Sequence, residues 1–177
     1  MDGETKEFKI RIYGDPVLRQ KASEVGEIDG GIASLARGMI SVLNQAKGLG
    51  LAAPQVGRSL SLCIINLPAL DAGRKEPLVL INPRIIGTHG RLVHQEGCLS
   101  FPELYAEVAR PKSVGIKARD INGRELELEA DEMLARVFLH EIDHLNGVLF
   151  IDHLSQLKRQ LIKKQLRQIT KIGQDWP

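Results

Sequence analysis

Apolar residues recur three and four positions apart in three stretches of the chain, as they do on the buried face of an amphipathic helix. These stretches run from about residue 31 to 46, from 131 to 145 and from 155 to 172. Residues that suit helix starts precede them, and residues that suit helix ends follow the first two: Asp29, Asp131, Ser155, Gly48, Asn146 and Gly147. The pattern therefore predicts three helices with defined ends.

Strand-like patterns occupy much of the chain between the first two helices. Runs rich in Leu, Ile and Val and bounded by Gly or Pro cover residues 59–67 and 77–86, and a shorter run covers 91–94. Residues 114–119 and 125–129 alternate between apolar and polar on either side of an Asn-Gly turn. This second pattern predicts a β-hairpin.

The order of these elements indicates the fold class. A short strand or extended arm at residues 9–13 comes first, and the other strands precede a helix that is predicted to be buried at their centre. This order favours an α+β fold over a doubly wound sheet. The 177 residues contain no repeat, linker or low-complexity segment, so residues 1–177 are expected to form one domain.

The second predicted helix carries candidate chemistry. His140 and His144 are four residues apart and so share a helix face, with Cβ atoms about 5–6 Å apart. Two such imidazoles can bind one metal ion, and Glu141 can reach a water molecule bound to it. Chance matches to this short pattern are frequent, and two core histidines bonded to the backbone are the alternative. That alternative does not explain a carboxylate within an apolar helix, where an unpaired charge is costly.

A catalytic metal needs a third protein ligand. The extended metalloprotease pattern fails because Phe150 stands where its third histidine belongs. A downstream glutamate as third ligand also fails, because none of residues 153–174 is acidic. His153 follows the end of the helix and is interpreted as a surface residue. Cys63 lies inside an apolar strand and is interpreted as a small buried side chain. Cys98 remains, because it lies in a predicted turn, and a thiolate with two imidazoles leaves one tetrahedral position open.

A glycine-rich loop, Gly48-Leu-Gly-Leu-Ala-Ala-Pro-Gln55, follows the first helix. It is not a dinucleotide-binding fingerprint, because the third glycine is absent and the loop follows a helix instead of a strand. It also lacks the Gly-Lys-Ser/Thr of a phosphate loop. Spacing alone favours a helix end followed by a turn. The alternative is that the glycines let another backbone approach while Gln55 presents its amide.

Composition narrows the classes of function. A net charge of +2, with 43% hydrophobic and 26% charged residues, is that of an ordinary globular protein and indicates no polyanion partner. The polar residues 1–7 do not resemble a signal peptide, and no apolar run approaches the roughly 18–20 residues of a membrane-spanning helix. Two cysteines suit a reducing cytosol. We therefore expect a cytoplasmic protein with neither DNA nor a membrane as partner.

The last predicted helix is strongly basic. It has no acidic residue and carries Lys158, Arg159, Lys163, Lys164, Arg167 and Lys171. Charges at helical spacing most often form a solvated face, but the absence of acids leaves an anionic partner open.

Three stretches, in this order and at these spacings, resemble the signature motifs of the peptide deformylase family. They are Gly48–Gln55, Glu96-Gly-Cys-Leu-Ser100 and His140-Glu-Ile-Asp-His144. Each motif alone is weak, but the ordered set is specific, and the resemblance extends over nearly the whole chain. It implies a metal-dependent hydrolase of linear amides that removes the N-formyl group from the formyl-methionine of new polypeptides and releases formate. It also implies antiparallel sheets packed around the histidine-bearing helix, with an N-terminal and a C-terminal helix.

The resemblance also implies roles for the matching residues. The implied metal ligands are Cys98, His140 and His144. The residues implied at the reacting group are Glu141, as acid and base, and Gln55 and the backbone N–H of Leu99, as donors to the formyl oxygen. The residues implied along the substrate backbone and methionine pocket are Gly48, Leu49, Gly50, Tyr105 and Val137. Some members have an arginine at the position of Tyr105, which affects contacts with the substrate end.

The identity of the metal is left open by the residues. Ligand chemistry alone favours zinc for a Cys-His-His site, whereas the resemblance implies Fe²⁺ in the cell, with Zn²⁺, Ni²⁺ or Co²⁺ able to occupy purified protein. The resemblance also suggests that the basic last helix contacts the ribosome. Two alternative functions are a zinc peptidase of another kind and a non-catalytic metal-binding module. Around the site, Arg110 is expected to contact Asp143 or Glu96.

Overall fold

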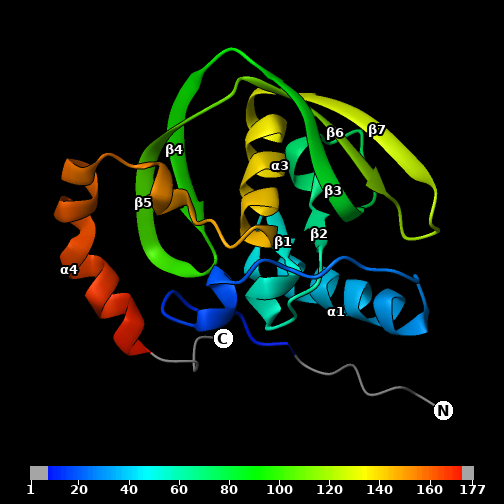
Figure 1. The fold of residues 1–177 in the computed structure, drawn as a ribbon, viewed down its shortest axis with the longest axis horizontal. Helices are drawn as coiled ribbons and strands as arrows, with labels where there is room; N and C mark the ends of the chain where they lie inside the picture. Colours follow the sequence, from blue (N-terminus) through cyan, green and yellow to red (C-terminus); the bar gives the residue numbers. More distant parts are fainter. Residues whose placement is uncertain (1–7, 173–177) are drawn as a thin grey trace.

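The structure, a computed structural model, describes residues 8–172 (Figure 1). The polar residues 1–7, expected not to be a signal peptide, lie outside the described residues. The elements, with η marking a 3₁₀-helix, are η1 (Pro16–Arg19), α1 (Gly30–Ala46), β1 (Gly50–Ala52), η2 (Ala53–Val56), β2 (Leu62–Ile65), α2 (Leu67–Leu70), β3 (Leu78–His89), β4 (Leu92–Cys98), β5 (Phe101–Arg110), β6 (Ser113–Arg119), β7 (Glu125–Asp131), α3 (Glu132–Leu145), η3 (Phe150–His153) and α4 (Gln156–Ile172). Within residues 8–172, no helix has both the length and the apolar character needed to cross a bilayer.

Two antiparallel sheets lie on either side of α3 (Figure 1). The larger sheet has the strand order β1-β2-β3-β6-β7, and the smaller one pairs β4 with β5. Neighbouring strands are antiparallel in both sheets. The expected α+β fold, with α1 near the start and α4 near the end of the chain, is therefore confirmed.

The larger sheet is buried on both faces where it passes between α1 and α3. Leu62 and Ile64 of β2 join an apolar cluster with α1, whereas Cys63 and Ile65 join a cluster with α3. Successive side chains of a strand point to opposite faces, so a strand covered on both sides needs a continuous apolar run. This is why β2 has no polar residue.

The central helix α3 lies deep in the molecule. From Ala135 to Leu145, every residue except Asp143 is buried. Four of the buried residues are polar: Arg136, His140, Glu141 and His144. Buried polar groups are costly without partners, so the positions of these four side chains mark the region where chemistry is expected.

A third apolar cluster places β5 and the C-terminal helix. The rings of Phe101 and Phe150 meet edge to face, with centroids 5.0 Å apart. Ile169 of α4 belongs to the same cluster. As a result, α4 packs on the side of β5 that is turned away from α3 (Figure 1).

The sequence pattern missed two strands. Residues 50–52 were predicted to lie in a loop but form β1, and β5 was not predicted at all. β1 is too short to show a period, and Pro102 followed by Glu103 at φ 57° interrupts the alternation of β5. In addition, β4 continues to Cys98, well beyond the predicted residues 91–94.

The predicted helix ends are right in part. The side chains of Asp29 and Ser155 cap α1 and α4 as predicted. Asp131 precedes α3, but its side chain makes no capping hydrogen bond. Asp131 is still the last residue of β7, and the chain enters the helix through Glu132 at φ 51°. At the end of α1, the left-handed residue is Lys47 and not the glycine that follows it.

Candidate metal centre and cleft

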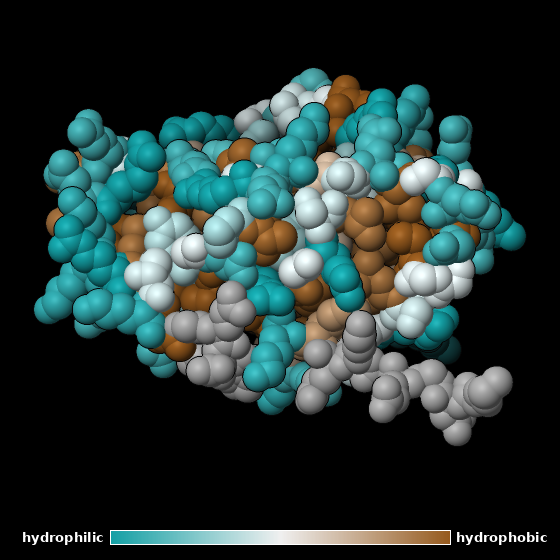
Figure 2. Space-filling model, turned by 60° about the horizontal axis from the view of Figure 1, so that its bottom comes forward, coloured by the Kyte–Doolittle hydropathy of each residue, from teal (hydrophilic) through white to brown (hydrophobic). Residues whose placement is uncertain are grey.

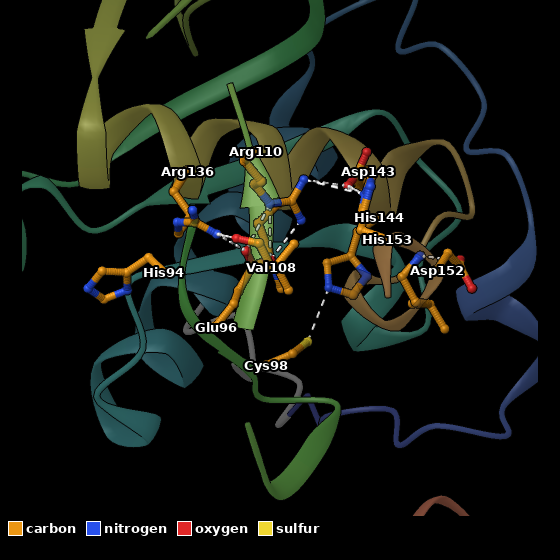
Figure 3. Close-up of polar contacts among 12 residues, drawn as sticks. His94, Glu96, Cys98, Val108, Arg110, Arg136, Asp143, His144, Asp152 and His153 are labelled. Atoms are coloured by element: carbon orange, nitrogen blue, oxygen red, sulfur yellow. Dashed lines mark hydrogen bonds and ion pairs between the residues drawn. The ribbon is translucent and has the colours of Figure 1, made fainter. Parts of the chain in front are cut away.

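Two elements that are distant in the sequence bring the three predicted metal-binding side chains together. α3 places His140 and His144 on one face, and the end of β4 places Cys98 against them. One ligand atom from each of the three residues lies within 4.8 Å of the others. The Cys98 sulfur is 3.2 Å from Nε2 of His144 (Figure 3). The structure thus joins the three residues proposed as ligands.

The donor set fits a divalent cation. One sulfur and two imidazole nitrogens are the ligands of many three-ligand catalytic sites, which leave a further position open. Two buried atoms at this site, Oε2 of Glu141 and Nδ1 of His144, lack a hydrogen-bond partner among the described residues. An unpaired carboxylate oxygen at such depth indicates that a further polar group belongs beside it.

Glu141 is buried next to the ligands and contacts the backbone of β1. Burial raises the pKa of its carboxyl from 4.5 to about 7. A Cβ atom on Gly50 would overlap with Oε1 of Glu141. The glycine is therefore required at this position, because any side chain would displace the carboxylate.

Gln55 reaches the site from η2. Its side chain is fully enclosed, and its Nε2 lies 3.4 Å from the Cys98 sulfur. Leu99 follows Cys98 in the tight turn between β4 and β5, where the strand register shifts. The side-chain amide of Gln55 and the residue Leu99 are thus both close to the Cys98 sulfur.

A buried ionic network of Glu96, Arg110 and Arg136 (Figure 3) supports His140. Glu96 lies 2.6 Å from Nδ1 of His140 and accepts hydrogen bonds from Arg110 and Arg136. Burial alone would raise the pKa of Glu96, but the hydrogen bonds from Arg110 and His140 hold it well below its usual range. A carboxylate on Nδ1 fixes the tautomer of the ring and leaves Nε2 free for a metal.

Arg110 contacts both of the carboxylates expected as its partners, Glu96 and Asp143. Its guanidinium bonds Glu96 in a bidentate manner and also donates to Asp143 at 2.8 Å. His153, interpreted from the sequence as a surface residue, is exposed but lies 2.7 Å from Asp143. The network therefore extends from the candidate ligand His140 to the molecular surface.

Removing the carboxylate of Glu96 is expected to destabilise the protein strongly. Glu96→Ala leaves the buried guanidinium of Arg136 without a counter-ion and that of Arg110 with Asp143 alone, so the free energy of unfolding should fall by about 3–5 kcal/mol. Urea denaturation of the metal-free protein measures this loss. Glu107→Ala is the control, because its pair with Lys158 is exposed and should contribute less than about 1 kcal/mol. Equal effects of the two substitutions would contradict the proposed role of the network.

Two of the candidate ligands, Cys98 and His140, line a cleft of about 610 Å³. Among the residues predicted to contact substrate, Val137 is buried, Leu49 is 38% exposed and Tyr105 is 63% exposed. The cleft residues include all of those predicted along the substrate: Gly48, Leu49, Gly50, Tyr105 and Val137. Five of the residues predicted to act in the chemistry also line this cleft, whereas His144 is buried behind it: Gln55, Cys98, Leu99, His140 and Glu141.

Sequence reasoning missed two residues at the site. Arg136 lines the cleft and bonds Glu96, together with the carbonyl oxygens of Leu92 and Val108. A sequence signal existed, because a charged residue one helical turn before His140 is unusual on an apolar helix. Ser100, in the turn after Cys98, is also fully buried against the site.

The fold and the site together define a class of protein, because a buried carboxyl beside a candidate Cys-His-His metal site in a cleft is the arrangement of a hydrolytic metalloenzyme. Comparison with known proteins specifies the family. The family model described as polypeptide deformylase matches residues 7–160. The peptide deformylase of Endomicrobium trichonymphae is 44% identical over 169 residues, which cover 96% of this chain and 98% of that protein.

Solved structures agree with this assignment. The crystal structure of a peptide deformylase from Legionella pneumophila has a TM-score of 0.86 and 38% identity, with coverage of 96% of this chain and 99% of that one. Peptide deformylase 1B of Arabidopsis thaliana, in complex with an inhibitor, has a TM-score of 0.87 and 40% identity, with coverage of 93% and 91%. The chain belongs to the polypeptide deformylase family. It is a metal-dependent hydrolase whose family function is removal of the N-formyl group from nascent peptides.

Proposed function

We propose that the residues gathered in the cleft carry out deformylation of formyl-methionine at the start of new polypeptides. The proposed metal ligands are Cys98, His140 and His144. The observation that carries the proposal is the buried carboxyl of Glu141, which lies next to these ligands and whose pKa is about 7. Residues 1–177 are proposed to act as one catalytic domain.

Glu141 moves the protons in this proposal. A carboxyl with a pKa near 7 can take a proton from the attacking water and later give one to the departing amine. Gln55 and the backbone N–H of Leu99 donate hydrogen bonds to the formyl oxygen, where negative charge develops. When bound, a divalent ion supplies Lewis acidity and lowers the pKa of a water molecule. The products are formate and a free methionine terminus.

The substrate backbone is proposed to lie along residues 48–50. β1 is an edge strand of the larger sheet, paired with β2 on one side and bordering the cleft on the other. An extended peptide can add to such an edge as a further strand. Leu49, Tyr105 and Val137 then border the methionine side chain, and Tyr105, which is the most exposed, contacts the outer part of the substrate.

Fe²⁺ is proposed as the ion in the cell, with Zn²⁺, Ni²⁺ or Co²⁺ in purified protein. A cysteine thiolate next to Fe²⁺ in an open cleft is prone to oxidation. Cys98 is half-buried and lines the cleft, which supports such sensitivity. Activity measured under anaerobic and aerobic conditions, after loading with each ion, distinguishes the metals.

Deformylation of formyl-Met peptides, with metal content measured on the same sample, tests the proposed function. We expect release of formate in proportion to the bound metal, and no cleavage of the same peptide without its formyl group. Cleavage of the unformylated peptide would indicate a zinc peptidase of another kind. A metal-replete protein without either activity would indicate a non-catalytic metal-binding module.

The basic helix α4 is proposed to bind the ribosome, and the protein is proposed to act in the cytoplasm. Hydrophilic residues dominate the end of the molecule where α4 lies (Figure 2). Reversing three exposed charges is expected to abolish co-sedimentation with ribosomes, because phosphate contacts dominate binding to RNA. One variant carries all three reversals: Lys163→Glu, Lys164→Glu and Arg167→Glu.

A control with the same change in net charge separates a local contact from general electrostatics. Its three reversed residues are exposed and lie outside α4: Lys21, Arg37 and Arg91. This control is expected to keep co-sedimenting, and deformylation of a free peptide should be unchanged in both variants. Co-sedimentation that survives the reversal in α4 would reject the proposed partner.

A further inference from the structure

We infer that Ser100 is a positioning residue that orients the side-chain amide of Gln55 toward the reacting group. Its hydroxyl oxygen lies 3.2 Å from Nε2 of Gln55, and its side chain is fully buried. The inference rests on the proposed role of Gln55 as a donor to the formyl oxygen. Ser100 itself has no proposed contact with substrate or metal.

The orientation of the Gln55 amide follows from its partners. Oε1 of Gln55 accepts a hydrogen bond from the backbone N–H of Ala52 at 2.8 Å. Turning the amide over would point its NH₂ group at that N–H, so two donors would face each other in a buried place. Nε2 is therefore directed to the side of Cys98 and Ser100.

Ser100 determines how the two N–H bonds of Gln55 are used. A primary amide has two N–H donors in one plane. Ser100 accepts one of them, and the other side of Nε2 faces the Cys98 sulfur at 3.4 Å. With one N–H held by the serine, the second N–H is kept at the metal ligand, where the formyl oxygen is proposed to bind. Without the serine, the orientation of the amide is restrained only by the Ala52 N–H and by the Cys98 sulfur, which is a weak acceptor.

The N-terminal arm holds both residues in place. The backbone N–H of Arg11 donates to the carbonyl oxygen of Gln55 at 2.7 Å, and that of Tyr13 donates to the carbonyl oxygen of Ser100 at 2.8 Å. N–H groups two residues apart on an extended chain point to the same side. The arm thus ties η2 to the turn between β4 and β5, which keeps Gln55 and Ser100 at a constant separation.

A double-mutant cycle tests the inference. Gln55→Ala should lower kcat about 100-fold, as loss of an oxyanion donor does. Ser100→Ala should lower kcat about tenfold with KM nearly unchanged, which is the scale of one hydrogen bond. The double variant should equal Gln55→Ala, because a residue that acts only through Gln55 has no effect once that side chain is gone.

A purely structural serine gives a different result. In that case Ser100→Ala would lower kcat by the same factor with and without Gln55, and this would overturn the inference. Metal content is measured on every variant, so that a change in loading is not mistaken for a change in kcat. If Gln55→Ala keeps the kcat of the unaltered protein, the proposed role of Gln55 fails, and this outcome is distinct from failure of the serine contact.

Nuclear magnetic resonance of the side-chain amides tests the contact without reference to activity. In the unaltered protein, one Nε2 proton of Gln55 should show a nuclear Overhauser effect to the β-protons of Ser100. In Ser100→Ala, the two Gln55 signals should shift and exchange faster with solvent. Absence of the effect in the unaltered protein, or unchanged signals in the variant, would overturn the inference even if the variant is less stable.

Discussion

Glu141→Gln is expected to keep its metal and lose nearly all deformylation. Glutamine has the shape of the glutamate and fits against Gly50, where there is no room for a shifted side chain. It cannot take a proton from water or return one to the amine. Positioned acid/base groups typically contribute about 10²–10⁴-fold, and Glu141 serves both proton transfers, so kcat should fall by about 10⁴-fold.

Steady-state kinetics and elemental analysis on the same protein check this expectation. The affinity for a formylated peptide should change little, because Glu141 is not proposed to bind the ground state. His153 lies at the other end of the ionic network, beyond Asp143, and His153→Gln serves as the control. This variant should retain most activity. A metal-replete Glu141→Gln protein with substantial turnover would exclude Glu141 as the acid and base.

Cys98→Ala is expected to lose its metal. Two histidines remain, and they share one helix face, but a site with two protein ligands has lost the sulfur that completes its donor set. Loss of an outer-shell partner already weakens metal binding about 10–100-fold, and loss of a ligand should weaken it further. Purified Cys98→Ala protein should therefore contain much less than one ion per chain.

Cys63→Ala is the matched control for this substitution. Both residues are free cysteines, but Cys63 is fully buried in β2 and belongs to the apolar cluster around α3. Its substitution should lower stability by about 1 kcal/mol while metal content stays complete. A full metal site in Cys98→Ala, measured by elemental analysis, would exclude Cys98 as a ligand.

The three long helices and the hairpin were predictable because their signals are local. α1, α3 and α4 each repeat apolar residues at helical spacing, and the β6–β7 hairpin carries an Asn-Gly turn between alternating segments. The spacing of His140 and His144 likewise implies a shared helix face, because residues four apart lie one above the other. Features of this kind depend on residues within one or two turns of one another.

The short and irregular elements were not predictable in the same way. β1 has three residues and becomes a strand only because β2 lies beside it. β5 contains a proline and a left-handed residue, and its pairing with β4 shifts register next to Cys98. Pairing between segments, and not the pattern within either segment, decides such strands.

The same difference between local signals and long-range contacts applies to the residues of the site. Residue types and order were sufficient to indicate two histidines, a carboxylate and a cysteine as a hydrolytic centre of a known family. The tertiary structure alone decided that Arg136 and Arg110 share Glu96, that Gly50 lies against Glu141 and that Ser100 reaches Gln55. Those contacts join residues up to 91 positions apart, as Gly50 and Glu141 are. Periodicity and spacing describe a segment and its own faces, whereas contacts at such separations are set by how whole elements pack.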